Sequence, residues 1–279
     1  AGSDMQKRDL FDCLNRGGMA CFALTEPGAG SDAGAVSCRA EKVEGGYILN
    51  GTKCFITNAP IADKITLFAN TREGGGIRGL TVFLVDADTK GISIGKEEDK
   101  MGIRASATAE IIFEDCFVPD SARVGKEGRG FMIAMQTLQM SRPVVAAISV
   151  GIAQAAIEAA VAYSHHRKQF GVKIATFEMV QQMIADMVMK TEAARILTYK
   201  ACVAQMNKDK KAGLYSAMSK CFASDTAMEV TTTAVQVMGG NGYSRENPVE
   251  KYMRDAKIMQ IYEGTNQVQR LVIANETTF

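Results

Sequence analysis

Short apolar runs alternate with polar residues and turn-forming glycines over the first 126 positions of the chain. A period of two, the repeat of a half-buried strand, is visible within residues 34–43. Further strand-like runs lie at 47–57, 65–71, 80–85 and 109–113. Short strands separated by turn signals at this spacing predict an antiparallel sheet or a small barrel.

The pattern changes after Gly130, where Ala, Met, Ile and Gln become frequent and Gly becomes rare. Three long segments of this kind cover 131–168, 177–206 and 214–238. Their high helix propensity and short connections predict a helical bundle. Shorter helices are expected at 249–258 and from Thr265 onward. The sequence therefore predicts an α+β protein, with an antiparallel β-sheet or small barrel domain followed by a C-terminal α-helical bundle.

Composition narrows the class of protein. Apolar residues make up 47% of the 279 residues, which is enough for a sizeable core. The 32 basic and 31 acidic residues nearly cancel, which argues against a nucleic-acid binder. We expect no membrane span, because no apolar run reaches the required length. The seven cysteines contain no Cys-x-x-Cys pair and fit free thiols in a reducing compartment.

The two histidines, His165 and His166, are adjacent. Neighbouring side chains on a helix point about 100° apart, so they are poorly placed to share a metal ion. Cysteines at zinc-ligand spacing and a Gly-x-Ser-x-Gly elbow are both missing from the sequence. We expect no metal site and no serine hydrolase, and we interpret the two histidines as a solvated helix end.

One carboxylate near the end of the chain is a candidate general base. Glu263 follows an apolar stretch and precedes Gly264, whose backbone is free to turn or to approach a ligand closely. Desolvation by the apolar neighbours makes a carboxylate a better proton acceptor. By itself the pattern equally describes a Glu that stabilises the start of a helix.

Two further patterns suit a flat polar ligand. Residues 28–33 match Gly-x-Gly-x-x-Ala, but a strand pattern follows them, so a dinucleotide-binding strand-helix-strand unit is not predicted. Such a loop still exposes backbone N–H groups to a flavin edge or a phosphate. Phe55 and Thr57 lie two apart on one predicted strand, so the ring and the hydroxyl face the same side. A plain turn and an ordinary half-buried strand remain the alternatives.

Seven segments together resemble the acyl-CoA dehydrogenase family of flavoenzymes. They include Thr-Glu-Pro-Gly-Ala-Gly-Ser-Asp at 25–32, an aromatic-Ile-Thr-Asn strand at 55–58 and Tyr-Glu-Gly-Thr at 262–265. The others lie at 142–143, 167–171, 236–242 and 253–257. The resemblance covers essentially the whole chain.

The resemblance implies FAD-dependent α,β-dehydrogenation of acyl-CoA thioesters to trans-2-enoyl-CoA. Glu263 would take the Cα proton while the flavin accepts a hydride from Cβ. The backbone N–H of Glu263 and a flavin hydroxyl would polarise the thioester carbonyl.

The resemblance also assigns binding residues. The cofactor-binding residues that it implies are Phe22, Leu24, Thr25, Gly30, Ser31, Phe55, Thr57, Arg167, Gln169, Phe170, Gln236, Gly239, Gly240, Thr265 and Gln267. The substrate-binding residues that it implies are Ser31, Gln139, Arg142 and Gly264. Two positions depart from the family pattern: Gln139 stands where many relatives carry Asp, and Glu178 where the family usually carries Gln.

Domain organisation follows from the same resemblance. Residues 1–17 would be the remnant of an N-terminal helical domain, 18–126 the β domain with flavin and substrate contacts, and 127–279 the bundle with the base. We expect most of the N-terminal helical domain to be absent from this sequence.

Expected partners are the acyl-CoA substrate, an electron-transferring flavoprotein and further copies in a homo-oligomer, a tetramer by resemblance. The expected compartment is the cytoplasm of a bacterium or the mitochondrial matrix of a eukaryote. Two alternatives stay open, an acyl-CoA oxidase-like enzyme and a catalytically silent binding or assembly protein. Reoxidation of the reduced flavin in air separates the first alternative from a dehydrogenase.

Overall fold

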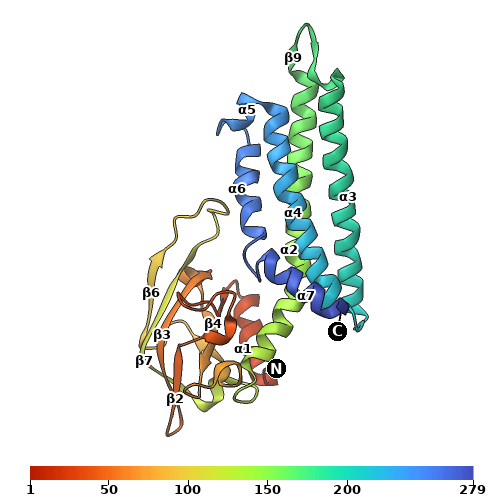
Figure 1. The fold of residues 1–279 in the computed structure, drawn as a ribbon. Helices are drawn as coiled ribbons and strands as arrows, with labels where there is room; N and C mark the ends of the chain where they lie inside the picture. Colours follow the sequence, from red (N-terminus) through yellow and green to blue (C-terminus); the bar gives the residue numbers. More distant parts are fainter. Residues whose placement is uncertain (279) are drawn as a thin grey trace. The chain divides into compact units, whose positions relative to one another are not determined.

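The computed structural model describes residues 1–278 and divides into two compact units (Figure 1). The first comprises residues 1–100 and 104–136, and the second comprises residues 101–103 and the chain from Thr137 onward. The predicted α+β class, a sheet domain followed by a helical domain, is confirmed.

The first unit is built on an eight-stranded sheet. Its strands are β1 (Ala20–Ala23), β2 (Arg39–Val43), β3 (Gly46–Thr57), β4 (Lys64–Asn70), β5 (Leu80–Asp86), β6 (Ile92–Glu97), β7 (Thr108–Pro119) and β8 (Arg123–Val124). They lie in the order β6-β7-β3-β2-β4-β5-β8, and β1 pairs with β4. Most neighbours are antiparallel, but β1 and β2 each pair with β4 in parallel. The sheet is therefore mixed, whereas the sequence predicted an antiparallel one.

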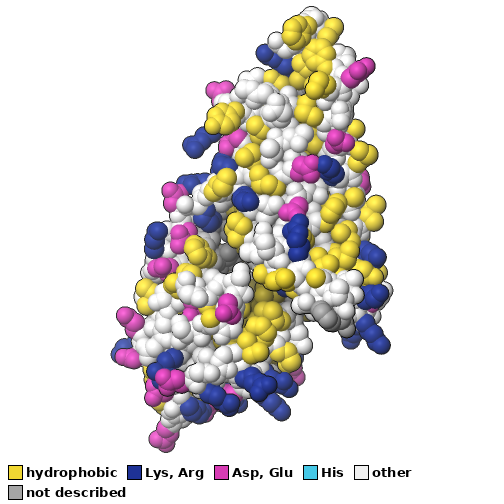
Figure 2. All heavy atoms as spheres, in the orientation of Figure 1, with side chains coloured by type: hydrophobic (Ala, Val, Ile, Leu, Met, Phe, Trp, Pro, Cys, Tyr) yellow, Lys and Arg dark blue, Asp and Glu magenta, His cyan; other side chains and the backbone are white. Residues whose placement is uncertain are grey.

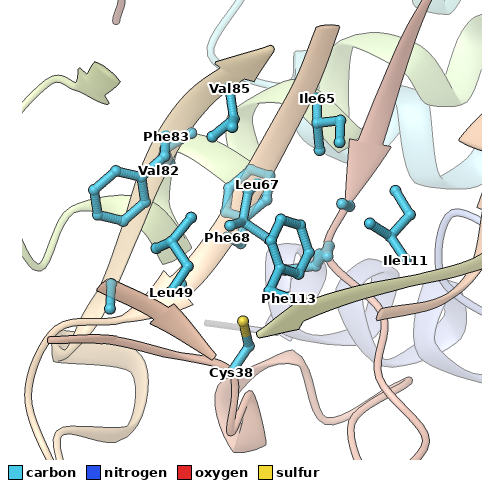
Figure 3. Packing of buried hydrophobic residues seen from close by; sticks show 14 of the residues in the cluster. Cys38, Leu49, Ile65, Leu67, Phe68, Val82, Phe83, Val85, Ile111 and Phe113 are labelled. Carbon is cyan, nitrogen blue, oxygen red and sulfur yellow. The ribbon is translucent and has the colours of Figure 1, made fainter. Parts of the chain in front are cut away.

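The core of this unit lies where β4 and β5 are apolar along nearly their whole length. Leu67, Phe68 and Phe83 have no exposed surface, and Figure 3 shows them beside residues from β3 and β7. The Phe22 ring packs on Phe68 with centroids 4.8 Å apart. Continuous apolar runs are typical of strands covered on both faces.

Four helices and strands of the first unit were not predicted from periodicity. Strands β1 and β8 are only four and two residues long, and β6 has no fully buried residue. Helix α1 (Asp4–Asn15) begins at a capping box formed by Ser3 and Gln6. The predicted origin of residues 1–17 in a larger helical domain stays a prediction.

The second unit is helical and contains most of α2. Its helices are α2 (Gly130–His166), α3 (Glu178–Met206), α4 (Ala212–Met238), α5 (Gly240–Tyr243), α6 (Val249–Met259) and α7 (Asn266–Thr278). Helix α4 is the central element, since it packs against α3, α5, α6 and α7. A two-stranded hairpin of β9 (Lys168–Gln169) and β10 (Val172–Lys173) connects α2 to α3.

Helix α2 corrects one expectation from the sequence. It is long and apolar enough to cross a membrane by length and composition, although the sequence analysis found no such run. Core helices of soluble proteins pass the same test. Small apolar residues of α2, among them Ala153, Ala156 and Ala160, lie buried in a cluster with residues of α3 and α4. Of the apolar 18-residue window of α2, 44% is buried inside the protein.

Candidate active site

Glu263 lies in the turn between α6 and α7, in an unusual backbone conformation. Its φ angle is 55°, and that of the following Gly264 is 89°. A left-handed conformation is ordinary for Gly, but for a residue with a Cβ it costs of order 1–3 kcal/mol. Surrounding contacts must therefore hold the turn at Glu263.

Side chains from two helices hold the carbonyl groups of this turn. Gln269 Nε2 on α7 donates to the Glu263 carbonyl at 3.2 Å and to the Gly264 carbonyl at 2.9 Å. Lys220 Nζ on α4 donates to the same Gly264 carbonyl at 2.9 Å. A Cβ at position 264 would lie 2.6 Å from Gln269 Nε2, so Gly is the residue that fits.

The Glu263 carboxylate is partly buried within the helical unit. The Ser141 hydroxyl on α2 donates a hydrogen bond to its Oε2. The neighbouring Arg142 is buried, and burial lowers the pKa of its guanidinium while attraction to Glu263 opposes the shift. Burial, assisted by the Glu263 charge, raises the pKa of Tyr262 to about 12. A polar hydroxyl and a buried cation thus flank the predicted base.

Two polar groups beside the base are left without partners. The Nε of Arg142 is buried and has no hydrogen-bond partner in the part of the chain that the structure describes. The backbone N–H of Glu263 likewise donates to no described residue. An unpaired donor next to a carboxylate can polarise a carbonyl while the carboxylate accepts a proton.

Four of the predicted flavin contacts of the first unit are exposed. Gly30 and Ser31 are exposed, and their N–H groups make no hydrogen bond to a described residue. Phe55 is 63% exposed with a φ of 56°, at an irregularity of β3 between Lys53 and Ile56, and Thr57 is exposed as well. An exposed aromatic ring, a hydroxyl and free N–H groups suit a flat heterocycle.

Three other predicted contacts lie closer to the core. Phe22 is partly buried against Phe68, Leu24 is buried, and Thr25 is partly buried. The Thr25 carbonyl accepts the N–H of Cys54 at 2.9 Å, which ties the loop to β3.

A buried ion pair that the sequence analysis did not single out fixes this loop. Lys53 Nζ donates to Glu26 Oε1 at 2.7 Å and to the Leu24 carbonyl at 3.0 Å. Ser37 and Cys38 donate three more hydrogen bonds to the Glu26 carboxylate. Burial raises the pKa of Glu26, but the Lys53 charge and these hydrogen bonds outweigh it, so the pKa is lowered. Glu26 stands inside the motif at 25–32 and Lys53 lies two residues before the motif at 55–58, which was the available signal.

The predicted contacts on α2 to α5 fall at one end of the helical unit. Arg167, Gln169 and Phe170 belong to the exposed connection at β9, and Phe170 is 95% exposed. Gln236, Gly239 and Gly240 are exposed around the end of α4. The two groups are neighbours, because Asn241 Nδ2 donates to the Tyr163 hydroxyl at 2.5 Å. Figure 1 shows this end of the unit far along the bundle from α7.

The remaining predicted residues lie nearer the base or apart from it. Thr265 and Gln267 line a hollow of about 340 Å³ beside Asp225 and Arg270. Gln139 is partly buried on α2, where its carbonyl accepts Gln205 Nε2 at 3.0 Å. Glu178 is exposed in the first turn of α3, a favourable place for a carboxylate.

Histidine and cysteine take no part in these groups. Both histidines are exposed at the end of α2. Across residues 1–278, no cluster of three or more His, Cys, Asp or Glu residues is placed to hold a metal. All seven cysteines are free thiols, and six are buried.

Two parts of this chain match a known protein family. The family description "Acyl-CoA dehydrogenase, C-terminal domain" matches residues 128–277, and "Acyl-CoA dehydrogenase, middle domain" matches residues 21–116. The chain belongs to the acyl-CoA dehydrogenase family. A probable acyl-CoA dehydrogenase of Mycobacterium tuberculosis is 48% identical over 98% of this chain and 70% of its own length.

Two chains of solved structures share the fold closely. Butyryl-CoA dehydrogenase from Megasphaera elsdenii is 46% identical, with a TM-score of 0.96 over 98% of this chain and 72% of its own. A chain from a study of the electron transferring flavoprotein of Acidaminococcus fermentans is 49% identical, with a TM-score of 0.96 over 99% and 73%.

Membership of the acyl-CoA dehydrogenase family confirms the predicted reaction class. The chain is an oxidoreductase of a flavoprotein family that dehydrogenates acyl-CoA thioesters. The residues that contact Glu263 and its turn were not identified from the sequence, because they reach it from distant segments. Ser141 stands 122 positions away from Glu263, and Lys220 stands 44 away from Gly264.

Proposed function

We propose that this protein uses FAD to dehydrogenate short-chain acyl-CoA thioesters, with Glu263 as the base that removes the Cα proton. The observation that carries the proposal is the Glu263 turn. It places a partly buried carboxylate and an unpaired N–H on the same residue, held by bonds from α4 and α7. One group is suited to accept the proton, and the other to stabilise charge on the thioester oxygen.

The chain's own residues account for the proton transfer. Removal of the Cα proton becomes easier as charge builds on the thioester oxygen, and the Glu263 N–H is the donor that stabilises that charge. Ser141 orients the carboxylate through Oε2, and Arg142 places a buried positive charge beside it. Gly264 lacks a side chain, which lets the Gln269 amide pack against this backbone. When bound, the flavin accepts the hydride from Cβ.

Residues of the first unit fit the isoalloxazine. The exposed Phe55 ring provides a packing surface, and Thr57, Gly30 and Ser31 supply donors that no described residue uses. In the helical unit, the hollow beside Thr265 and Gln267 is lined by polar groups that suit phosphate or sugar oxygens. FAD is therefore our proposed flavin.

The acyl group is assigned by relationship. The butyryl-CoA dehydrogenase at 46% identity supports a short straight chain. Ser31, Gln139 and Arg142 are the proposed substrate contacts besides Gly264. Because Gln139 replaces the Asp of many relatives, we assign it a neutral hydrogen-bonding role.

We further propose a homo-oligomer whose subunits share flavin sites. Arg167, Gln169, Phe170, Gln236 and Gly239 lie at the end of the helical unit away from Glu263, which supports their serving a neighbouring subunit's flavin (Figure 1). Such sharing requires closed symmetry. Exposed apolar residues on α3, at 189, 196, 199, 203 and 206, supply a face for a second copy (Figure 2).

We propose an electron-transferring flavoprotein as electron acceptor. The related chain from the electron transferring flavoprotein study supports this choice. The cytoplasm of a bacterium or the mitochondrial matrix is our proposed compartment.

Replacement of Glu263 by Gln tests the base. We expect Glu263→Gln to bind FAD but to bleach it about 10²–10⁴-fold more slowly with butyryl-CoA, as loss of a general base predicts. The matched control is Glu229→Gln, which removes an exposed carboxylate of α4 that pairs with Lys190. We expect the control to bleach at the normal rate. Bleaching of Glu263→Gln at the control rate would remove Glu263 from its assigned role.

A further inference from the structure

Lys220 is a buried cation whose partners are neutral oxygens. It stands on α4 with no exposed surface. Its Nζ donates to the Gly264 carbonyl and to Asn266 Oδ1, both at 2.9 Å. Within residues 1–278 no carboxylate lies within ion-pair distance of it. The other fully buried lysine, Lys53, differs because it pairs directly with Glu26.

A buried ammonium without a contacting carboxylate is costly, so its bonds must serve the structure around it. One of the oxygens that it binds belongs to the turn that carries Glu263, and the other to the first residue of the helix that follows. Asn266 is itself fixed, because its Nδ2 donates to Ser224 Oγ at 2.9 Å and to Asp225 Oδ1 at 2.7 Å. Lys220 thus joins α4 to the Gly264 carbonyl and to the first residue of α7.

These contacts bear on Glu263 through one peptide unit. The Gly264 carbonyl belongs to the residue directly after the proposed base, and both residues have a left-handed backbone conformation. Anchoring the Gly264 carbonyl restrains the backbone on one side of Glu263, and that backbone carries the Glu263 side chain and its unpaired N–H. Charge-assisted hydrogen bonds are roughly twice as strong as neutral ones, so the ammonium restrains the carbonyl better than a neutral group would.

We propose that Lys220 is the positioning residue of the catalytic base: its charged ammonium holds the Gly264 carbonyl and thereby sets the direction of the Glu263 carboxylate and N–H. The inference rests on the proposed function, because it assumes that Glu263 is the base. Lys220 itself touches neither reacting carbon.

The charges around Lys220 give this role a pH dependence. Burial lowers the pKa of its ammonium to about 8, and the Arg142 charge adds to the lowering. Cys221, Glu263 and Asp225 oppose it. The ammonium is therefore charged at neutral pH and loses its proton as the pH rises through about 8. Flavin reduction is expected to slow over the same range.

Three variants of Lys220 test the inference in the FAD-loaded protein, with butyryl-CoA as the probe. We expect Lys220→Met to retain FAD and bleach it about 10- to 100-fold more slowly, as loss of hydrogen bonds from a charged group predicts. Lys220→Arg keeps its charge up to far higher pH, so its alkaline decline should move above pH ~9. Lys220→Gln keeps a donor without the charge, and should show a reduced rate without the decline near pH 8.

A second readout is independent of the flavin and of turnover. Amide hydrogen exchange of the ligand-free protein should be faster at residues 263–269 in Lys220→Met, with exchange in α3 unchanged. The matched control is Lys190→Met, which removes an exposed lysine of α3 paired with Glu229. It should leave bleaching, pH profile and exchange as they are.

The outcomes separate the inference from the proposed function. Wild-type bleaching by Lys220→Met, or an unchanged alkaline decline in Lys220→Arg, would overturn the positioning role. If Lys220→Met does not fold, the Arg and Gln variants decide the question by the same criteria. Full activity of Glu263→Gln would instead overturn the base assignment, whatever Lys220 does.

Discussion

Replacement of Glu26 by Gln would leave the Lys53 ammonium buried without its counter-charge. Lys53 has no exposed surface and Glu26 is 4% exposed. The Glu26 carboxylate accepts four hydrogen bonds, one from Lys53, two from Ser37 and one from Cys38. A Gln side chain has one accepting oxygen and a donating amide, so donors of Ser37 or Cys38 would face another donor.

Two independent estimates give the size of the effect. Breaking a buried ion pair by removing one partner costs about 3–5 kcal/mol. Losing two hydrogen bonds to a charged acceptor, at about 1.5–3 kcal/mol each, gives about 3–6 kcal/mol. At roughly 2–4 °C per kcal/mol for chains of this size, the first estimate corresponds to a fall in melting temperature of about 6–20 °C.

Thermal unfolding of the two proteins, followed by circular dichroism, measures this change. The matched control is Asp120→Asn, which breaks the Lys42–Asp120 pair, both of whose side chains are about half exposed. We expect no measurable shift in the control, because exposed pairs are screened by water. The double variant Glu26→Gln with Lys53→Met removes both charges and should recover the part of the lost stability that comes from the unpaired Lys53 ammonium.

The stability that the Glu26 carboxylate contributes depends on pH in a definite direction. The pKa of Glu26 is lowered in the folded protein, so its stabilisation is present above the unfolded value of about 4.3 and is lost as the pH falls through the folded value. The difference between the two proteins should therefore be full at pH 7 and shrink in acid.

Equal melting temperatures for the wild type and Glu26→Gln at pH 7 would refute this reasoning. A double variant less stable than Glu26→Gln would refute it as well. Because the pair fixes the loop that carries Thr25, we also expect weaker FAD retention in the single variant than in the control.

Two further predictions concern the base turn and the oligomer. Gly264→Ala should slow flavin bleaching by butyryl-CoA, because a Cβ at position 264 would lie 2.6 Å from Gln269 Nε2. The matched control is Gly151→Ala at an exposed position of α2, which should bleach normally, because a Cβ there meets nothing within 4 Å. Equal rates for the two variants would contradict the close packing of the turn. Ile196→Glu on the exposed face of α3 should lower the mass of the oligomer measured by light scattering. The control Thr232→Glu, at an exposed position of α4, should leave that mass unchanged. An unchanged mass for Ile196→Glu would contradict the proposed role of the α3 face in subunit contact.

The pattern of the sequence predicted most of the elements. The period-two run at 34–43 contains β2, the other strand-like runs became β3, β4, β5 and β7, and the Ala- and Met-rich segments became α2, α3 and α4. These predictions succeed because backbone periodicity is a local property. Strands β1 and β6 escaped because one is short and the other lacks buried alternation.

The residues of the candidate site also divide into those that the sequence identified and those that it did not. Glu263 and Gly264 were recognisable from their motif, as were Phe55 and Thr57. Ser141, Lys220 and Gln269 were not, although all three hold the base turn. A Ser, Lys or Gln on a helix has no local signature that distinguishes a solvated side chain from one that holds a turn.

The sequence by itself thus determined the class of fold and the family, and it singled out Glu263 as the predicted base. Only the tertiary structure decided which side chains contact Glu263 and its turn, and which ion pair fixes the loop at residues 24–26. The physical reason is separation along the chain: Glu26 and Lys53 are 27 residues apart, and Ser141 and Glu263 are 122 apart. Partners so distant are brought together by the packing of strands and helices, which no local pattern encodes.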